Sequence, residues 1–172
     1  MFDAPFLSEK IIIACYAAPL LVAAAFDFWT YRIPNSVTVA FAALYFGCTL
    51  YFFWGMGINW LSHIGACLAV LVVGLGLFYF NIFGGGDIKL LAAIALWIGF
   101  SRYLAIFLLV TGVAGGVLAL SLLALRGAIS MFPIPFPAYL PTPFQHRAPI
   151  PYGVAVVVGA LWVASVVPFL LA

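Results

Sequence analysis

The sequence carries very little charge. Only four of its 172 residues are Asp or Glu and six are Lys or Arg, whereas 68% of the chain is hydrophobic. The mean hydropathy of +1.31 lies far above that of soluble globular domains. This composition excludes an ordinary soluble domain and predicts an integral membrane protein.

Cysteine and histidine are too scarce and too scattered to indicate a metal or redox site. Cys15, Cys48 and Cys67 form no Cys-x-x-Cys pair, and His63 and His146 each stand alone in the sequence. Zinc sites and redox couples normally need such clusters. We therefore expect the cysteines to pack in the core, and we expect no metal and no cofactor.

The long apolar runs predict an all-α membrane bundle. A bilayer crossing takes about 20 residues, and five runs of that order lie at roughly 10–29, 36–56, 60–82, 103–125 and 150–171. A sixth run, 88–100, is short, and the chain should break after it, near Gly99 to Arg102, because one helix from Ile88 to Leu125 would be about 57 Å long. The alternation of a membrane β-barrel is absent. The expected fold is a polytopic bundle of six transmembrane helices with a short fourth helix, in a single domain over residues 1–172.

The basic residues predict which side of the membrane each loop occupies. With six spans, four basic residues fall on one side and two on the other: Arg32, Lys89, Arg126 and Arg147 against Lys10 and Arg102. The side richer in Lys and Arg is normally cytoplasmic. We therefore expect the first group to face the cytoplasm and both termini to face outward.

The four acidic residues divide into two pairs. Asp3 and Glu9 precede the first apolar run, which is unlike the positive start of a signal peptide, so we expect that first helix to be retained. Asp27 and Asp87 lie at the edges of apolar segments, where a carboxylate is costly. Two crossings separate them along the chain, so both should lie on one membrane face at a similar depth.

Two neighbouring carboxylates suggest a specific chemistry. Close acids cannot both ionise cheaply and tend to share one proton. The ionised acid can then take a proton from water while the other donates to a substrate carbonyl, as in aspartic proteases. A transporter or channel that uses the pair as an ion or proton site fits the composition equally well.

Three glycines stand directly before the second acid, in "FGGGDIKL" at 83–90. Gly84, Gly85 and Gly86 lack Cβ atoms, so a substrate backbone could approach Asp87, or the loop could adopt conformations closed to other residues. The alternative is a plain flexible turn. We also expect Asp87 to be the N-cap of the short helix.

The first acid opens the stretch "DFWTYRIPN" at 27–35. Pro34 restricts the residue before it to an extended conformation and is suited to opening the next helix. The alternative for Asp27 is an ion pair with Arg32 at the membrane edge.

These motifs together resemble a known family. Asp27 followed by "RIPN" at 32–35, then "GGGDIKL" at 84–90 and "PIPYGVAV" at 149–156, is similar to the type IV prepilin peptidases, which are membrane aspartyl proteases of the GxGD type. The resemblance implies that Asp27 and Asp87 are catalytic. Residues expected to bind substrate or support the site are Gly84, Gly85, Gly86, Lys89, Arg32, Pro34 and Asn35.

The resemblance also implies the partners and the location. The substrate would be a prepilin or pseudopilin, cut just before its hydrophobic segment at the cytoplasmic face of the bacterial inner membrane, and no nucleic acid would be bound. Longer family members carry paired cysteines in an N-terminal loop and also methylate the pilin. This chain has no such pair, so we expect a peptidase without methyltransferase activity, as in the short members that serve Flp pili.

Three further expectations concern the rest of the chain. The proline-rich stretch 131–149 should be a connector or a membrane-associated loop near the active face. Gly112 and Gly116 should form a close contact between helices of the bundle. An intramembrane protease of the presenilin or signal-peptide-peptidase type is a further alternative, although its "PAL" motif is replaced here by "PIP" at 149–151.

Overall fold

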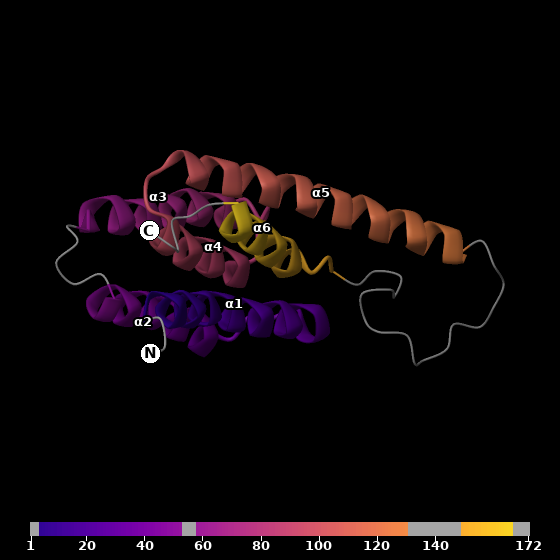
Figure 1. Ribbon diagram of the computed structural model, residues 1–172. Coiled ribbons are helices and arrows are strands. Elements are labelled where there is room, and N and C mark those ends of the chain that lie inside the picture. Colours follow the sequence, from indigo (N-terminus) through magenta and orange to yellow (C-terminus); the bar gives the residue numbers. More distant parts are fainter. Residues whose placement is uncertain (1–3, 53–57, 131–148, 167–172) are drawn as a thin grey trace.

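The computed structural model describes residues 4–52, 58–130 and 149–166, and these form six α-helices (Figure 1). In chain order they are α1 (Ala4–Thr30), α2 (Asn35–Phe52), α3 (Trp60–Tyr79), α4 (Gly85–Ile98), α5 (Arg102–Ser130) and α6 (Tyr152–Val166). The predicted all-α fold with a short fourth helix is confirmed. The proline-rich stretch falls, apart from Pro149, outside the described residues.

The short helix α4 occupies the centre of the bundle. It packs against α2, α3, α5 and α6, while α1 packs against α2 and α6. In Figure 1, α1 and α2 lie along one side of the bundle, and α5 lies along the other. Every residue from Leu90 to Ile98 is buried. A helix of only 14 residues is therefore stable here because protein, not lipid, surrounds it.

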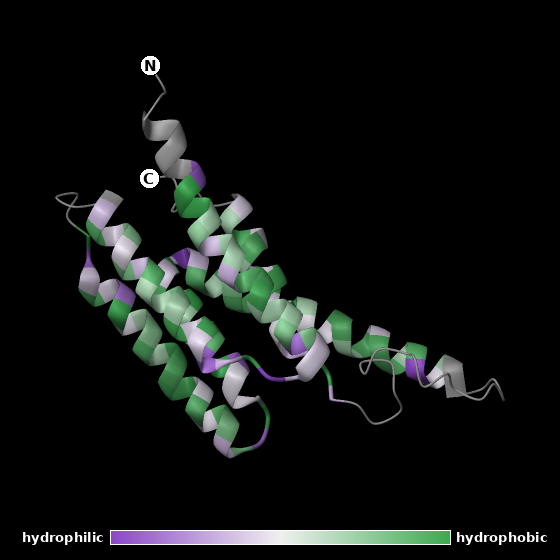
Figure 2. Cartoon of the chain, turned by 90° about the horizontal axis from the view of Figure 1, so that it is seen from below, coloured by the Kyte–Doolittle hydropathy of each residue, from purple (hydrophilic) through white to green (hydrophobic). Residues whose placement is uncertain are grey.

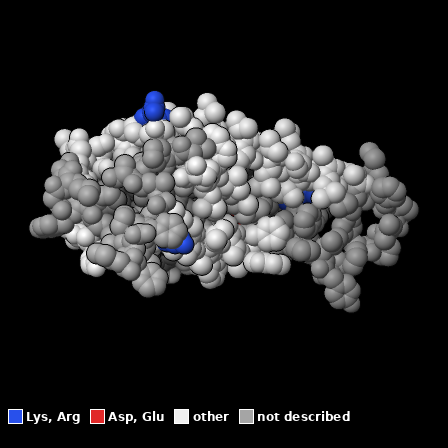
Figure 3. Space-filling view, viewed as in Figure 1, with Lys and Arg blue, Asp and Glu red and all other residues white. Residues whose placement is uncertain are grey.

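Within the described residues, three helices are long and apolar enough to cross a membrane by themselves. The crossing segments are Lys10–Thr30 in α1, Trp60–Tyr79 in α3 and Arg102–Ala128 in α5. The described parts of α2 and α6 are shorter apolar helices. Figure 2 shows hydrophobic residues along the helices and hydrophilic ones gathered near the connections, and the face in Figure 3 displays only scattered basic side chains and no acidic one among the residues that are not grey. The protein is thus a multi-pass membrane protein.

The predicted break between α4 and α5 is confirmed. α4 ends at Ile98, and Gly99 follows it with φ of 70°, a left-handed conformation that favours glycine. The next amide, of Phe100, donates to Ser62 Oγ at the start of α3 (2.9 Å). This turn therefore ties the end of α4 to α3 before the chain reverses into α5.

Aromatic side chains fill the core beside the C-terminal end of α4. Trp97 stacks on Phe41 with ring centroids 5.3 Å apart, and Tyr16 meets its edge at the same distance. Trp97 Nε1 also donates to the carbonyl oxygen of Phe41 (3.2 Å). Cys48 belongs to this buried core and the other two cysteines are partly buried against it, as expected.

The expected contact of Gly112 and Gly116 with another helix is wrong. Neither glycine has a neighbouring atom where its Cβ would stand. Gly115, between them, faces α6 instead, and its Cβ would lie 3.4 Å from the ring of Tyr152. A helix turns by about 100° per residue, so spacing alone did not reveal which of the glycines faces the bundle.

Candidate active site

Asp27 lies near the C-terminal end of α1, buried against the start of α6. Its side chain is only 5% exposed, and the backbone N–H groups of Gly153 and Val154 donate to its carboxylate. The residue before α6 is Pro151, which has no side-chain oxygen to cap the helix. Asp27 therefore caps α6 from another helix, where the exposed N–H groups favour a negative charge.

The contact between α1 and α6 depends on Gly153. A Cβ at this position would stand 2.8 Å from Cγ of Asp27, which is closer than non-bonded atoms tolerate. The carboxylate can accept a further hydrogen bond, because its Oδ2 atom is buried and has no hydrogen-bond partner among the described residues. A buried polar atom without a partner is costly, and it marks this oxygen as one that can bind a substrate group or water.

Asp87 lies in the first turn of α4, but it is not the N-cap residue that we expected. The helix begins at Gly85 and Gly84 occupies the N-cap position, so Asp87 is the third helical residue. Its carboxylate accepts the backbone N–H of Gly84, as the acidic residue does in a capping box. The sequence therefore predicted correctly that Asp87 caps the helix. It assigned Asp87 to the N-cap position, however, which is three residues before its actual place in the helix.

The three glycines do not supply unusual backbone angles. Gly84 is extended (φ −73°, ψ 143°), and neither Gly85 nor Gly86 has a positive φ. What Gly84 supplies is space, because a Cβ there would lie 2.9 Å from Oδ2 of Asp87. At Gly85 and Gly86 the nearest atoms would be 3.5 Å away, an ordinary contact.

The two acids face one cavity of about 750 Å³ and are close enough to interact electrostatically. The structure thus brings together residues 60 positions apart in sequence. The cavity is lined by Asp27, Tyr31, Arg32, Ile33, Asn35, Phe78, Asn81, Ile82, Phe83, Gly84, Gly85, Gly86, Asp87, Lys89, Pro149, Ile150 and Tyr152. This set includes every predicted site residue except Pro34, which lies in the connection just before α2.

The cations of the cavity do not neutralise its acids. Lys89 Nζ donates instead to Oδ1 of Asn35 (2.9 Å), joining α4 to α2. The structure contains no ion pair between Asp27 and Arg32, so the alternative in which Asp27 merely pairs with this cation is not supported. Both carboxylates remain directed at the cavity.

Sequence reasoning missed several lining residues. Tyr31 has a buried hydroxyl with no partner in the part of the chain that the structure describes, and a left-handed backbone (φ 53°), which is uncommon for a residue other than glycine. Phe83 and Tyr152 meet across the cavity with ring centroids 6.0 Å apart. Tyr31 could have been predicted as a lining residue, because it follows Asp27 by four residues, which is about one helical turn. The contact between Phe83 and Tyr152 depends on tertiary packing, so no pattern in the sequence indicated it.

A comparison with protein families identifies the family of the chain. The model of the type IV leader peptidase family matches residues 14–120. The chain belongs to the type IV leader peptidase family. No curated protein and no solved structure matches it. The match to the leader peptidase family covers both aspartates, whereas α6, which Asp27 caps, lies beyond it. In general terms the protein is therefore a membrane protease of the leader peptidase type.

Proposed function

We propose that the protein is an aspartyl endopeptidase that removes the N-terminal leader of a prepilin or pseudopilin, with Asp27 and Asp87 as its catalytic pair. The observation that carries this proposal is the shared cavity, where the carboxylates of α1 and α4 interact electrostatically. Membership of the leader peptidase family supports the reaction class. The two acids supply the chemistry that such a reaction needs.

The reaction consumes one water molecule for each leader removed. With one proton on the pair, the ionised carboxylate takes a proton from water while the water oxygen bonds to the scissile carbonyl carbon. The protonated carboxyl gives its proton to the carbonyl oxygen, forming a tetrahedral intermediate. Collapse of that intermediate breaks the C–N bond: the leaving nitrogen takes the proton that came from water, and a hydroxyl of the intermediate returns a proton to the other carboxylate as the C=O bond reforms. The products are a leader with a carboxyl end and a pilin with a free amine.

The surrounding residues hold both acids in place for this exchange. Gly153 and Val154 fix Asp27 and leave its Oδ2 atom unpaired, while Gly84 holds Asp87. The backbone donors cost no reorganisation during the reaction, because the helices hold them in position. Arg32, Asn35 and Lys89 lie at the same cavity, where we assign them to binding the polar leader side of the substrate.

The cleavage would take place at the cytoplasmic face of the bacterial inner membrane. The excess of basic residues expected on this side supports that placement. Residues 1–172 contain no Cys-x-x-Cys pair like that of the bifunctional relatives, which supports peptidase activity without methylation, and the motif resemblance supports a Flp-type pilin as substrate.

The transporter alternative is less well supported. An ion path through the membrane would have to continue past α4, whose residues beyond Lys89 are all buried and apolar. At its far end the rings of Tyr16, Phe41 and Trp97 pack together. A path for a charged ion would need polar groups or water along this route.

Leader removal from a Flp-type prepilin in lipid vesicles tests the proposal. We expect the wild type to cut at the junction before the apolar segment, and we expect Asp27→Asn and Asp87→Asn each to lower the rate at least about 10³-fold while inserting normally. Asp3→Asn serves as the control and should cut at the wild-type rate. Near-normal cleavage by either site variant would contradict the proposal, and a cut inside the apolar segment would favour the presenilin-type alternative.

A further inference from the structure

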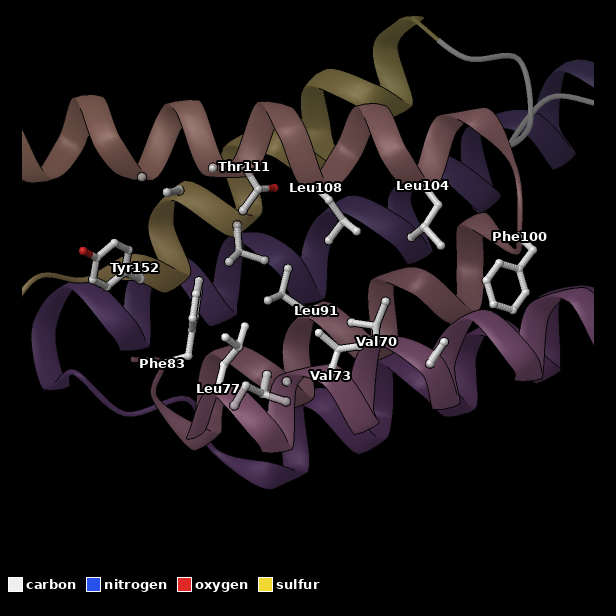
Figure 4. Close-up of a pocket in the computed structure, with 17 residues that line it drawn as sticks. Val70, Val73, Leu77, Phe83, Leu91, Phe100, Leu104, Leu108, Thr111 and Tyr152 are labelled. Atoms are coloured by element: carbon white, nitrogen blue, oxygen red, sulfur yellow. The ribbon is translucent and has the colours of Figure 1, made fainter. Parts of the chain in front are cut away.

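A second cavity lies between α3 and α5 and has a volume of about 450 Å³ (Figure 4). Its walls come from α3 and α5 and its floor from α4 and α6. We call it the lateral groove, and it is lined by Ala69, Val70, Val73, Gly74, Leu77, Phe83, Ile88, Leu91, Phe100, Leu104, Leu108, Thr111, Gly112, Gly115, Tyr152, Ala155 and Val156. The lining contains no charged residue, so it suits an apolar occupant.

The lateral groove exists because its two walls do not pack together. α3 and α5 each pack against α4, but they are not among the helix pairs in substantial contact. The wall residues Val73 and Leu108 remain 65% and 41% exposed. Because both walls belong to membrane-crossing segments, the groove faces the hydrocarbon of the bilayer and can be entered from the side.

The lateral groove adjoins the catalytic cavity, and the contacting rings of Phe83 and Tyr152 lie at the boundary between them. Phe83 and Tyr152 line both spaces, and Figure 4 shows them at one end of the groove with Phe100 at the other. From the catalytic end, the groove follows α5 from Gly115 back to Leu104, a length of about 16 Å. This is about three turns of a helix lying alongside.

We infer that the lateral groove binds the apolar helical segment that follows the leader of the substrate, an inference that rests on the proposed function. A substrate whose scissile bond lies at the two aspartates must continue into the membrane next to them. The groove begins at that point and runs into the bilayer. Its volume accommodates the side chains of one helix face, not a whole helix of about 10–12 Å diameter. The opposite face of the substrate helix therefore stays in lipid.

An acyl chain of a membrane lipid is the competing occupant. It would match the apolar lining, but it gives no reason for the groove to end beside the catalytic cavity. The small residue Gly112 also gives α5 a flat wall, of the kind that lets another helix approach closely. The junction with the catalytic cavity therefore favours the substrate helix.

Filling the lateral groove tests this inference. Gly112 lines the groove and has no atom within 4 Å of its Cβ position, so Gly112→Phe should fill the space without disturbing the fold. Gly116→Phe is the matched control, because Gly116 is one turn away on α5, is equally free of neighbours and does not line the groove. With the membrane-embedded prepilin we expect at least a tenfold slower cleavage for Gly112→Phe and the wild-type rate for Gly116→Phe.

Photocrosslinking identifies the occupant directly. A photoreactive amino acid at Leu108 should label the apolar segment of the prepilin, whereas one at Leu109, which is 67% exposed and outside the groove, should label lipid. Wild-type cleavage by Gly112→Phe, or labelling of lipid alone from Leu108, would overturn the inference while the wild-type enzyme still removes leaders. Failure of the wild type to cut any prepilin would instead refute the proposed function.

Discussion

The two ends of α4 differ in how tightly they are held. At the C-terminal end, Trp97 is buried among aromatic rings and donates to a carbonyl of α2, and His63 Nδ1 lies 2.8 Å from the carbonyl oxygen of Leu96. At the N-terminal end, the N-cap is Gly84, which has no side chain to pack, and the first turn lines a cavity of about 750 Å³. One end is closed by packing and the other is open.

This difference separates stability from chemistry within a single short helix. The closed end fixes the position of α4 in the bundle, so the open end can present Asp87 without being packed over. The same holds for α1, where Tyr16 and Leu20 are fully buried in the core and Asp27 lies further along at the cavity. A substitution at the closed end should therefore lower stability, and one at the open end should lower activity.

The largest effect on stability is expected from Trp97→Ala. The substitution removes a buried ring and leaves a cavity among Tyr16, Phe41 and Tyr45, so we expect a loss of about 3 kcal/mol. This loss is at the low end of the range for replacing a buried Trp by Ala. In a bundle surrounded by lipid, the substitution mainly removes packing contacts and loses little of the free energy of transfer from water. Thermal unfolding in detergent measures it. An unchanged unfolding temperature would show that the aromatic core does not anchor α4.

A smaller effect, confined to activity, is expected from Gly84→Ala. The new methyl group would press on Oδ2 of Asp87 and displace the carboxylate, so we expect cleavage to fall about 10- to 100-fold, equivalent to about 1.4–2.7 kcal/mol. Gly85→Ala is the matched control, because its methyl group would make only an ordinary contact with Phe78. Initial cleavage rates at matched expression measure both. Equal rates for the two variants would contradict the steric role of Gly84.

The sequence alone predicts the helices, the end of α4 and the common location of the two acids. Apolar runs and the overlong stretch after Ile88 predict the helices and the break at Gly99, because length and composition follow from the bilayer. Counting membrane crossings predicts that Asp27 and Asp87 share a face. Neither argument needs tertiary contacts, and the structure brings both acids to one cavity.

Other features of the site could not be read from the sequence because they arise from packing between distant segments. The capping of α6 by Asp27, through the N–H groups of Gly153 and Val154, joins residues more than 120 positions apart, and the space that Gly84 leaves depends on the rotamer of Asp87. The lateral groove forms because α3 and α5 do not pack against each other, and no local sequence pattern indicates this. A single motif could indicate which residues are candidates for catalysis, but not how they are held.

The measurement that tests the central claim most directly is the cleavage rate of the Asp27→Asn, Asp87→Asn double variant beside the two single variants, on one prepilin in the same vesicles. If the acids act as one unit that shares a proton, each single variant already loses the mechanism, and the double variant should be no slower than the slower single variant. Losses that multiply in the double variant, or a single variant that cuts near the wild-type rate, would contradict a catalytic pair.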